Sequence, residues 1–297
     1  MRSALLPDRG VVKVAGDDAQ KLLNGLLTAD VGRVTPQAAR YAALLTPQGK
    51  IIVDCIVAQA PDAEGGGYFL DCPRALVSTL VGRLNFYKLR AKVIIEDLAE
   101  TLGVLAVWGD GGGTKPQGLA YADPRLPALG LRVMLPPHRA GTVAIEIGAE
   151  TVDAAVYEAH RIALGVPRGG LDFMYGDAYP HETDMDQLHG VDFDKGCYVG
   201  QEVVSRIEHR SRARTRIVPV AYDEFAPEVG IPVTAGDKQV GTMGSAAAGR
   251  GLAMLRLDRV GEALAAGATL CCGGIALRIV KPDWMRIAFP GDAAAAE

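Results

Sequence analysis

One cysteine of this sequence stands among residues that could activate it. Cys197 lies in the segment Lys195-Gly196-Cys197-Tyr198-Val199-Gly200-Gln201-Glu202. The two flanking glycines permit a tight backbone and close approach by a ligand. Val203, Val204 and Ile207 fall on one face of a helix that should start just beyond the cysteine. Because a helix N-terminus and a nearby lysine both favour a thiolate, we expect a nucleophile, a redox group or a soft-metal ligand here.

A small buried cysteine that merely packs is the alternative interpretation, and it suits the other thiols better. Cys55 sits inside an apolar strand, whereas Cys72 precedes a proline at a helix start and fits either interpretation. Cys271 and Cys272 are neighbours on a predicted strand, so their side chains should point to opposite faces. The chain has no Cys-x-x-Cys pair. Cysteine spacing therefore predicts no metal site.

Basic residues gather after the cysteine segment, at Arg206, His209, Arg210, Arg212, Arg214 and Arg216. On a strand, Arg212, Arg214 and Arg216 would share one face. The favoured interpretation is a solvated edge strand protected by charge. The functional alternative is a surface that receives a carboxylate tail or a phosphate backbone. Because no aromatic residues are interleaved, direct binding of tRNA is not expected.

Histidines and carboxylates crowd the stretch before the cysteine, at His181, Glu182, Asp184, Asp186, His189, Asp192 and Asp194. A metal site is conceivable in such a cluster. However, the spacing His-Glu-x-x-His is absent, and carboxylates are common in solvated loops. The sequence therefore predicts no metal centre.

Alternating helical and strand-like stretches position these residues. Strands are expected at 10–14, 41–45, 51–57, 68–70, 93–95 and 102–107, and helices after Gly16, at 73–87 and at 151–164. Asp17 or Asp18 could cap the first helix. The segments 41–45 and 51–57 should form a hairpin, because a turn containing proline and glycine joins them. This pattern predicts an α+β body with mostly antiparallel sheet.

The pattern changes after Arg212, where short apolar strands alternate with glycine, proline and aspartate. No convincing helix intervenes, except a turn near 261–266. Such a sequence is typical of a small all-β barrel. We therefore expect a body at 1–211, a barrel at 212–290 and a disordered tail at 291–297.

Composition narrows the setting of the protein. The 297 residues carry a formal charge of −4, which gives no global signal for nucleic acid or for an acidic membrane surface. No apolar run approaches the ~20 residues of a membrane span, and the first residues do not resemble an export signal. The five scattered cysteines suit reduced thiols. We therefore expect a soluble, cytoplasmic protein.

The segment from Lys195 to Glu202, followed by Arg206, resembles the signature of the YgfZ family. That family belongs to the superfamily of the glycine-cleavage T-protein, an aminomethyltransferase. Further stretches that resemble the family are 16–31, 45–50, 161–167, 180–182, 193–195 and 241–245. The resemblance therefore covers nearly the whole chain.

The resemblance implies a fold, a ligand and a role. The expected fold is a folate-binding α+β body of two intertwined subdomains around a central channel, followed by a β-barrel. Family members bind tetrahydrofolate non-covalently and support assembly or repair of iron–sulfur enzymes, with indirect effects on tRNA modification. The expected partners are folate and iron–sulfur client or assembly proteins, and a cluster could reside transiently on the chain.

The resemblance also implies roles for particular residues. Cys197 is the key residue and Lys195 would favour its thiolate. The glycines Gly196 and Gly200 would shape the turn around Tyr198, and Gln201 and Glu202 would fix it by hydrogen bonds. Arg206 with Arg214 could guide an anionic tail. Folate contacts are expected from Arg161, Glu182 and Arg214.

The chain departs from true aminomethyltransferases, which carry an acidic residue in the helix that corresponds to 74–80 and a pterin-contacting glutamate near Arg161. Neither carboxylate is present here. One-carbon chemistry needs a group near the folate nitrogen for proton handling, so turnover of that kind is not expected. The rival interpretations are a folate-dependent aminomethyl or C1 transferase or demethylase, and an RNA-interacting accessory factor.

Overall fold

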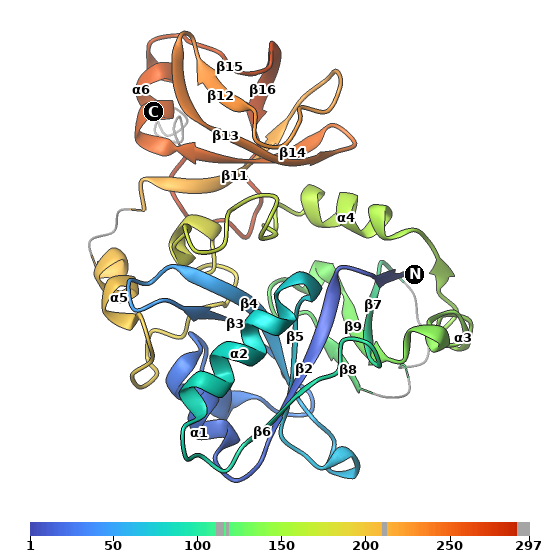
Figure 1. Cartoon of the computed structure of the whole chain (residues 1–297). Helices are drawn as coiled ribbons and strands as arrows, with labels where there is room; N and C mark the ends of the chain where they lie inside the picture. Colours follow the sequence, from blue (N-terminus) through green and yellow to red (C-terminus); the bar gives the residue numbers. More distant parts are fainter. Residues whose placement is uncertain (111–115, 117–118, 210–212, 290–297) are drawn as a thin grey trace. The chain divides into compact units, whose positions relative to one another are not determined.

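A computed structural model describes residues 1–110, 116, 119–209 and 213–289 (Figure 1). Its contacts divide the chain into two compact units. Unit 1 contains Met1–Tyr157 and Leu188–Gln201, and unit 2 contains Glu158–Gln187 and the chain from Glu202 onward. The segment that carries Cys197 thus belongs to unit 1, while the chain on both sides of it belongs to unit 2.

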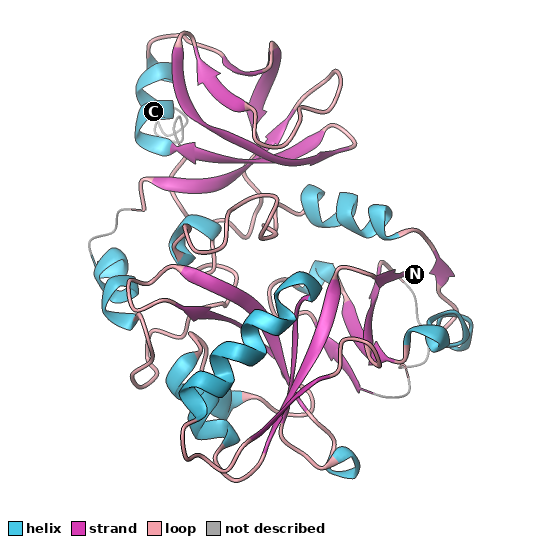
Figure 2. Cartoon of the chain, viewed as in Figure 1, coloured by secondary structure: helices cyan, strands magenta, loops and turns pink. Residues whose placement is uncertain are grey.

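Unit 1 contains two five-stranded sheets (Figure 2). The first has the order β10-β1-β7-β9-β8 and consists of β1 (Arg2–Leu6), β7 (Gly103–Trp108), β8 (Leu119–Ala122), β9 (Leu131–Leu135) and β10 (Glu150–Thr151). The second has the order β3-β4-β5-β2-β6 and consists of β2 (Arg9–Ala15), β3 (Arg40–Leu45), β4 (Ile51–Gln59), β5 (Tyr68–Pro73) and β6 (Ile94–Asp97). All of these pairs are antiparallel except β1 with β10.

Helices cover the apolar face of the second sheet. These are α1 (Ala19–Leu26) and α2 (Val77–Lys88), which lies across the sheet in Figure 1. Leu23, Leu80 and Leu84 are fully buried in the core that they share with the strands. The third helix of this unit, α3 (Ala140–Glu146), packs with β7 and β9 in a separate core. Burial of apolar surface holds both layers together.

Buried ion pairs join the two sheets of unit 1. Asp71 on β5 accepts from Arg9 on β2 at 2.6 Å and from Arg132 on β9 at 2.7 Å. Arg132 also donates to Asp123 at 2.8 Å, and Arg125 donates to the same carboxylate at 2.7 Å. Burial alone would raise the pKa of Asp71 and Asp123, but the arginines outweigh it and lower both. The carboxylates of the network therefore stay charged.

Unit 2 is built around a closed barrel with the order β11-β14-β13-β12-β15-β16. Its strands are β11 (Thr215–Ala221), β12 (Pro232–Ala235), β13 (Lys238–Ala247), β14 (Arg250–Arg256), β15 (Leu270–Cys272) and β16 (Ile275–Ile279). The helix α6 (Leu257–Ala265) packs on them. Residues 158–187 hold to the barrel through Asp172, which accepts from the Ser245 amide at 2.7 Å.

Two further helices run across the division of the chain into units. They are α4 (Ala154–Ala163) and α5 (Gln201–His209). The short helix η6 (Pro180–Thr183) belongs to unit 2. The remaining short 3-10 helices are η1 (Val31–Arg33), η2 (Asp62–Glu64), η3 (Arg74–Leu76), η4 (Pro127–Leu129) and η5 (Pro137–Arg139).

The α+β class, the C-terminal barrel and the 41–57 hairpin are confirmed. The elements that were not predicted include β1, β10 and α3, and the expected turn near 261–266 is part of α6. The carboxylate of Asp18 accepts from the Lys92 amide at 2.8 Å and does not cap α1. The boundary at 211/212 and the tail 291–297 lie outside the described residues. The division at 1–211 and 212–290 and the central channel stay predictions.

Candidate functional site

The segment around Cys197 is fastened to the end of α1. The ammonium of Lys195 donates to the carbonyl oxygens of Asn24 at 2.7 Å and Leu27 at 2.6 Å. The Val199 amide donates to the Gly25 carbonyl at 3.3 Å. The last carbonyls of a helix lack partners within it, and their partial negative charge favours a cation. Lys195 therefore completes the C-terminus of α1 and holds the segment there.

Burial has the largest effect on the pKa of Lys195, which is 8% exposed. Burial lowers its pKa to about 8, against the opposing influence of Asp30 and Asp192. The ammonium lies 4.8 Å from the ring centre of Tyr198, a distance at which a cation and a ring attract. Both hydrogen bonds that the ammonium of Lys195 donates go to carbonyl oxygens at the end of α1. Its expected influence on the Cys197 thiol stays a prediction.

The chain just before the cysteine is tied to the same region of unit 1. Thr28, which is fully buried, donates to the Gly190 carbonyl at 2.6 Å and accepts from the Ala43 amide at 2.8 Å. Asp192 accepts from the Asp30 amide at 2.6 Å. These bonds fix residues 190–192 against the loop after α1, so the cysteine segment is held at both ends.

The two glycines that flank Cys197 differ in their surroundings. Gly200 has a φ of +85°, and a Cβ there would lie 2.6 Å from the Thr46 carbonyl oxygen and 3.2 Å from the Gly49 Cα. Only glycine fits this approach to the β3–β4 turn. A Cβ on Gly196 would meet no heavy atom within 4 Å. Gly200 therefore permits close approach to the β3–β4 turn of the chain itself.

Cys197 is exposed, whereas Cys55, Cys72 and Cys272 are buried and Cys271 is partly buried. The helix predicted to follow the cysteine is confirmed as α5, which begins at Gln201. A thiol that is accessible on a fixed backbone can act as a nucleophile, a redox group or a ligand for a soft metal.

The remaining signature residues lie on α5. Gln201 is half-buried, and Glu202 and Arg206 are exposed. Within the described ranges, the side chains of Gln201 and Glu202 form no hydrogen bonds; only the Gln201 amide donates, to the Tyr198 carbonyl at 3.3 Å. Their expected part in fixing the turn therefore stays a prediction.

The expected strip of arginines on one exposed face is not formed. Arg216 is buried and donates to Asp186 at 2.6 Å and to Asp184 at 3.2 Å. Arg214 is exposed just before β11, and Arg210 and Arg212 lie outside the described residues. The interpretation as a solvated edge strand is wrong for Arg216, which is buried, and β11 pairs with β14 along its whole length and with β16 at Val220 and Ala221. Buried carboxylates and barrel closure, which the local sequence does not reveal, explain both differences.

Of the expected folate contacts, Arg161 is committed to its own unit. Its five N–H groups donate to Glu158, Val166, Asp172 and Ser245 at 2.5–3.1 Å. No donor remains for a ligand, so Arg161 is a structural residue. Glu182, whose carboxylate accepts from the Tyr179 amide at 2.9 Å, and Arg214 line one cavity of about 310 Å³ in unit 2. The structure thus brings two of the three residues together.

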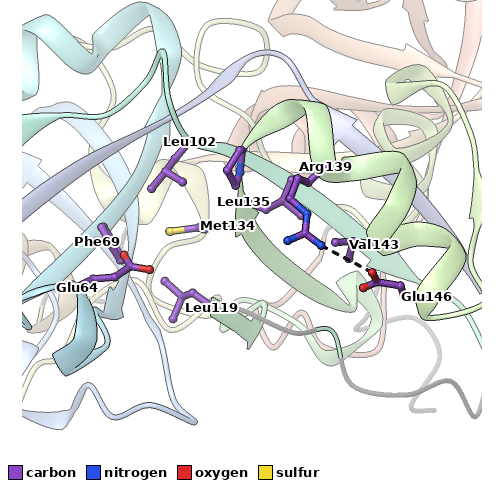
Figure 3. A pocket seen from close by; sticks show the side chains of 10 residues that line it. Glu64, Phe69, Leu102, Leu119, Met134, Leu135, Arg139, Val143 and Glu146 are labelled. Atoms are coloured by element: carbon purple, nitrogen blue, oxygen red, sulfur yellow. Dashed lines mark ion pairs between the residues drawn. The ribbon is translucent and has the colours of Figure 1, made fainter.

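A separate pocket of about 360 Å³ opens in unit 1 (Figure 3). Apolar side chains such as Phe69, Leu102 and Met134 line it, and Arg139 and Glu146 form an ion pair across 3.7 Å at its edge. No predicted site residue lines this pocket.

The chain is similar to a known barrel domain and to known whole proteins. Residues 214–287 match the family model described as the CAF17 C-terminal beta-barrel domain. The iron-sulfur cluster assembly factor IBA57 homolog of Mycosarcoma maydis is 37% identical over 74% of this chain, and that of Coccidioides immitis is 32% identical over 79%. The chain spans only 57% and 61% of those two relatives. The human iron-sulfur cluster assembly factor IBA57 is 31% identical over 94% of this chain and 84% of its own length.

Among solved structures, the chain is similar to the glycine cleavage system aminomethyltransferase T of Bartonella henselae. The TM-score is 0.74 at 16% identity, and the match covers 97% of this chain and 87% of the other. An identity this low shows the fold alone. The expectation of an aminomethyltransferase-like fold is confirmed.

The expectation of a cytoplasmic protein is wrong, since the relatives from Mycosarcoma maydis, Coccidioides immitis and human are all named mitochondrial. Scattered cysteines without a disulfide framework indicate a reducing compartment, but they do not show which reducing compartment it is. No helix within the described ranges is long and apolar enough to cross a membrane. The resemblance to YgfZ stays a prediction, because the relatives carry the name IBA57. By its identity to the human protein over most of both lengths, the chain belongs to the IBA57 family.

Proposed function

We propose that this chain supports assembly or repair of iron–sulfur clusters, and that it acts through Cys197. The names of its relatives support the first part. The observation that carries the second part is the one exposed thiol among the five cysteines, set on a segment fixed by Lys195 and Gly200. Thiolates are the usual protein ligands of iron–sulfur clusters.

The geometry favours contact of the thiol with a cluster, a sulfur species or a partner protein. A cluster generally needs four protein ligands, and one accessible thiol supplies one. A stable cluster would therefore need further ligands from a client, from an assembly protein or from a second copy of the chain. Effects on tRNA modification would follow indirectly, through iron–sulfur enzymes.

Replacing Cys197 tests this role. Cys197→Ala should leave the fold intact, because the side chain is exposed, and should abolish the restoration of iron–sulfur enzyme activity in cells that lack the protein. Cys271→Ala, which removes a half-buried thiol of unit 2, is the matched control and should restore activity. Full restoration by Cys197→Ala would refute the role of this residue.

Tetrahydrofolate is the proposed ligand of the same fold. A carboxylate can accept the N–H groups of a pterin ring, and a guanidinium can pair with the carboxylates of the glutamate tail. Glu182 and Arg214 offer these two groups in one cavity, so this pair fits the ligand, whereas Arg161 does not. When bound, folate would supply one-carbon carrier chemistry. The proposed role of Cys197 does not require one-carbon transfer.

Titration of the purified protein with tetrahydrofolate under anaerobic conditions tests this part. Glu182→Gln and Arg214→Ala should each weaken binding about tenfold or more, as expected for loss of a charge-assisted hydrogen bond worth about 1.5–3 kcal/mol. Arg250→Ala removes an exposed cation elsewhere on the barrel and should leave binding unchanged. Equal affinity in all three variants would place folate elsewhere or exclude it. Cys197→Ala should bind folate as the natural protein does.

A further inference from the structure

Three side chains from two segments of unit 2 converge at one place. They are His181 on η6, Asp186 just after it, and Glu208 near the end of α5. One ligand atom from each lies within 4.8 Å of the others, and His181 Nε2 is 2.9 Å from Glu208 Oε2. We propose that these residues bind a divalent transition-metal ion, and zinc, which imidazole nitrogen and carboxylate oxygen both ligate, is the ion to test.

Binding requires only small movements: the ligand atoms now lie within 4.8 Å of one another, and His181 Nε2 and Glu208 Oε2 are 2.9 Å apart. Zinc bonds of about 2.0–2.2 Å in a tetrahedron place ligand atoms roughly 3.3–3.6 Å apart. His181 is 2% exposed and supplies a fixed nitrogen. The side chain of Glu208 is 44% exposed and can move toward the ion. One fixed ligand and one mobile ligand are a suitable combination for a site that closes on its metal.

The charge around the cluster favours a dication. Asp184, Asp186 and Glu208 contribute three carboxylates, and Arg216 is the cation that bonds to two of them. Asp184 is fully buried, and its Oδ2 atom has no hydrogen-bond partner within the described ranges. Buried carboxylate oxygens require compensation by a hydrogen bond or a cation. Asp186 and Glu208 bring two carboxylates to the ligand position, and a dication bound there would balance them.

The metal would face a cavity. All three ligands and Arg216 line a space of about 390 Å³, together with Ile207 and Leu257. Three protein ligands leave the fourth position of zinc open to water or to an incoming group, which distinguishes catalytic and exchange sites from closed structural ones. The same ion would also join the end of α5 to η6, since Glu208 and His181 come from those elements.

This inference does not depend on the role of Cys197. The three ligands lie in unit 2 and Cys197 lies in unit 1, and zinc uptake is measured without any cluster or client protein. Thiols also bind zinc, so the measurement is made on the full chain with Cys197→Ser. That background leaves the His181 cluster as the site under test.

Equilibrium dialysis with zinc, followed by metal analysis, gives the stoichiometry and affinity. We expect one zinc per chain, and Glu208→Gln and Asp186→Asn should each weaken binding about tenfold or more. Glu224→Gln, which removes an exposed carboxylate of the same unit, is the matched control and should bind normally. Far-ultraviolet circular dichroism of each variant establishes that the chain is folded.

Cobalt replaces zinc as a spectroscopic probe of ligand type. The cobalt-loaded protein should show the visible bands of nitrogen and oxygen ligation without an intense thiolate charge-transfer band. His181→Ala should lose these bands. Absence of zinc uptake by the Cys197→Ser protein, a thiolate spectrum, or equal affinities of Glu208→Gln and Glu224→Gln would each overturn the assignment.

Discussion

Gly200 and Gly196 provide a matched pair of substitutions on either side of Cys197. Gly200→Ala forces a residue with a Cβ into a φ of +85°, which costs about 1–2 kcal/mol. The new Cβ would also lie 2.6 Å from the Thr46 carbonyl oxygen, so the β3–β4 turn must shift, at a cost of about 1–3 kcal/mol. The sum predicts a loss of about 2–5 kcal/mol. For a domain of this size, the expected fall in Tm is about 5–15 °C.

Gly196→Ala should behave differently. Its Cβ meets no atom within 4 Å, and its φ lies outside the left-handed region. Alanine reduces the conformational freedom of the unfolded chain, so the expected change is neutral or a gain of about 0.4–1 kcal/mol. The two substitutions are chemically identical and lie four residues apart, one on each side of Cys197. Their contrast isolates the packing of Gly200 on the turn.

The tryptophans allow the loss to be assigned to unit 1. Trp108 lies in unit 1 and Trp284 in unit 2, and they are the two tryptophans of the chain. With Trp284→Phe as the common background, urea unfolding followed by fluorescence reports on Trp108 alone. A Gly200→Ala variant as stable as its parent, or a Gly196→Ala variant equally destabilised, would refute the packing argument.

Three further predictions concern buried charges. Burial would raise the pKa of Asp123, but Arg125 and Arg132 lower it, so the stability that this carboxylate confers is present above about pH 4 and is lost as the pH falls toward the lower folded-state pKa. Asp123→Asn should cost about 3–5 kcal/mol at pH 7, and the urea midpoint, measured from Trp108 fluorescence, should then fall less steeply at acid pH. Burial lowers the pKa of Lys195 to about 8, so between pH 8 and about 10.4 the unfolded chain binds more protons than the folded one. The free energy of unfolding should therefore rise by up to about 3 kcal/mol over that range, and Lys195→Met should remove the rise. Asp172→Asn should destabilise unit 2 by about 3–5 kcal/mol, measured from Trp284 fluorescence, because the carboxylate compensates a buried guanidinium.

Local patterns were sufficient for the elements that repeat a simple period. The hairpin of β3 and β4 follows from two apolar, β-prone stretches joined by a turn with Gly49 at a φ of +80°. The barrel follows from short strands separated by turn residues, and α5 from its apolar positions at 203, 204 and 207. Each of these signals lies within a dozen residues of the element that it predicts.

Long-range partners could not be predicted in the same way. Lys195 bonds to carbonyls that precede it by 171 and 168 residues, and a backbone acceptor leaves no trace in the residue types. The sequence predicts ligand roles for Arg216 and Arg161 because the carboxylates that hold them lie 30 and 11 residues away in irregular chain. The strand β1 was missed because residues 2–6 offer too short a pattern, and it is stabilised by pairing with β7.

The position of the cysteines decides what Cys197 can do alone. Cys55 lies in β4, Cys72 in β5 and Cys272 in β15, and all three are buried. These thiols could reach a cluster only if their strands left the sheets, at a cost comparable to unfolding. One exposed thiol then remains per chain, aside from the half-buried Cys271 of the other unit. If Cys197 ligates a cluster as we propose, a second molecule must supply the remaining ligands, because a cluster generally takes four protein ligands. The rigid fastening of the segment by Lys195 and Gly200 suits this role, because a thiol already held in place loses little conformational entropy on meeting its partner.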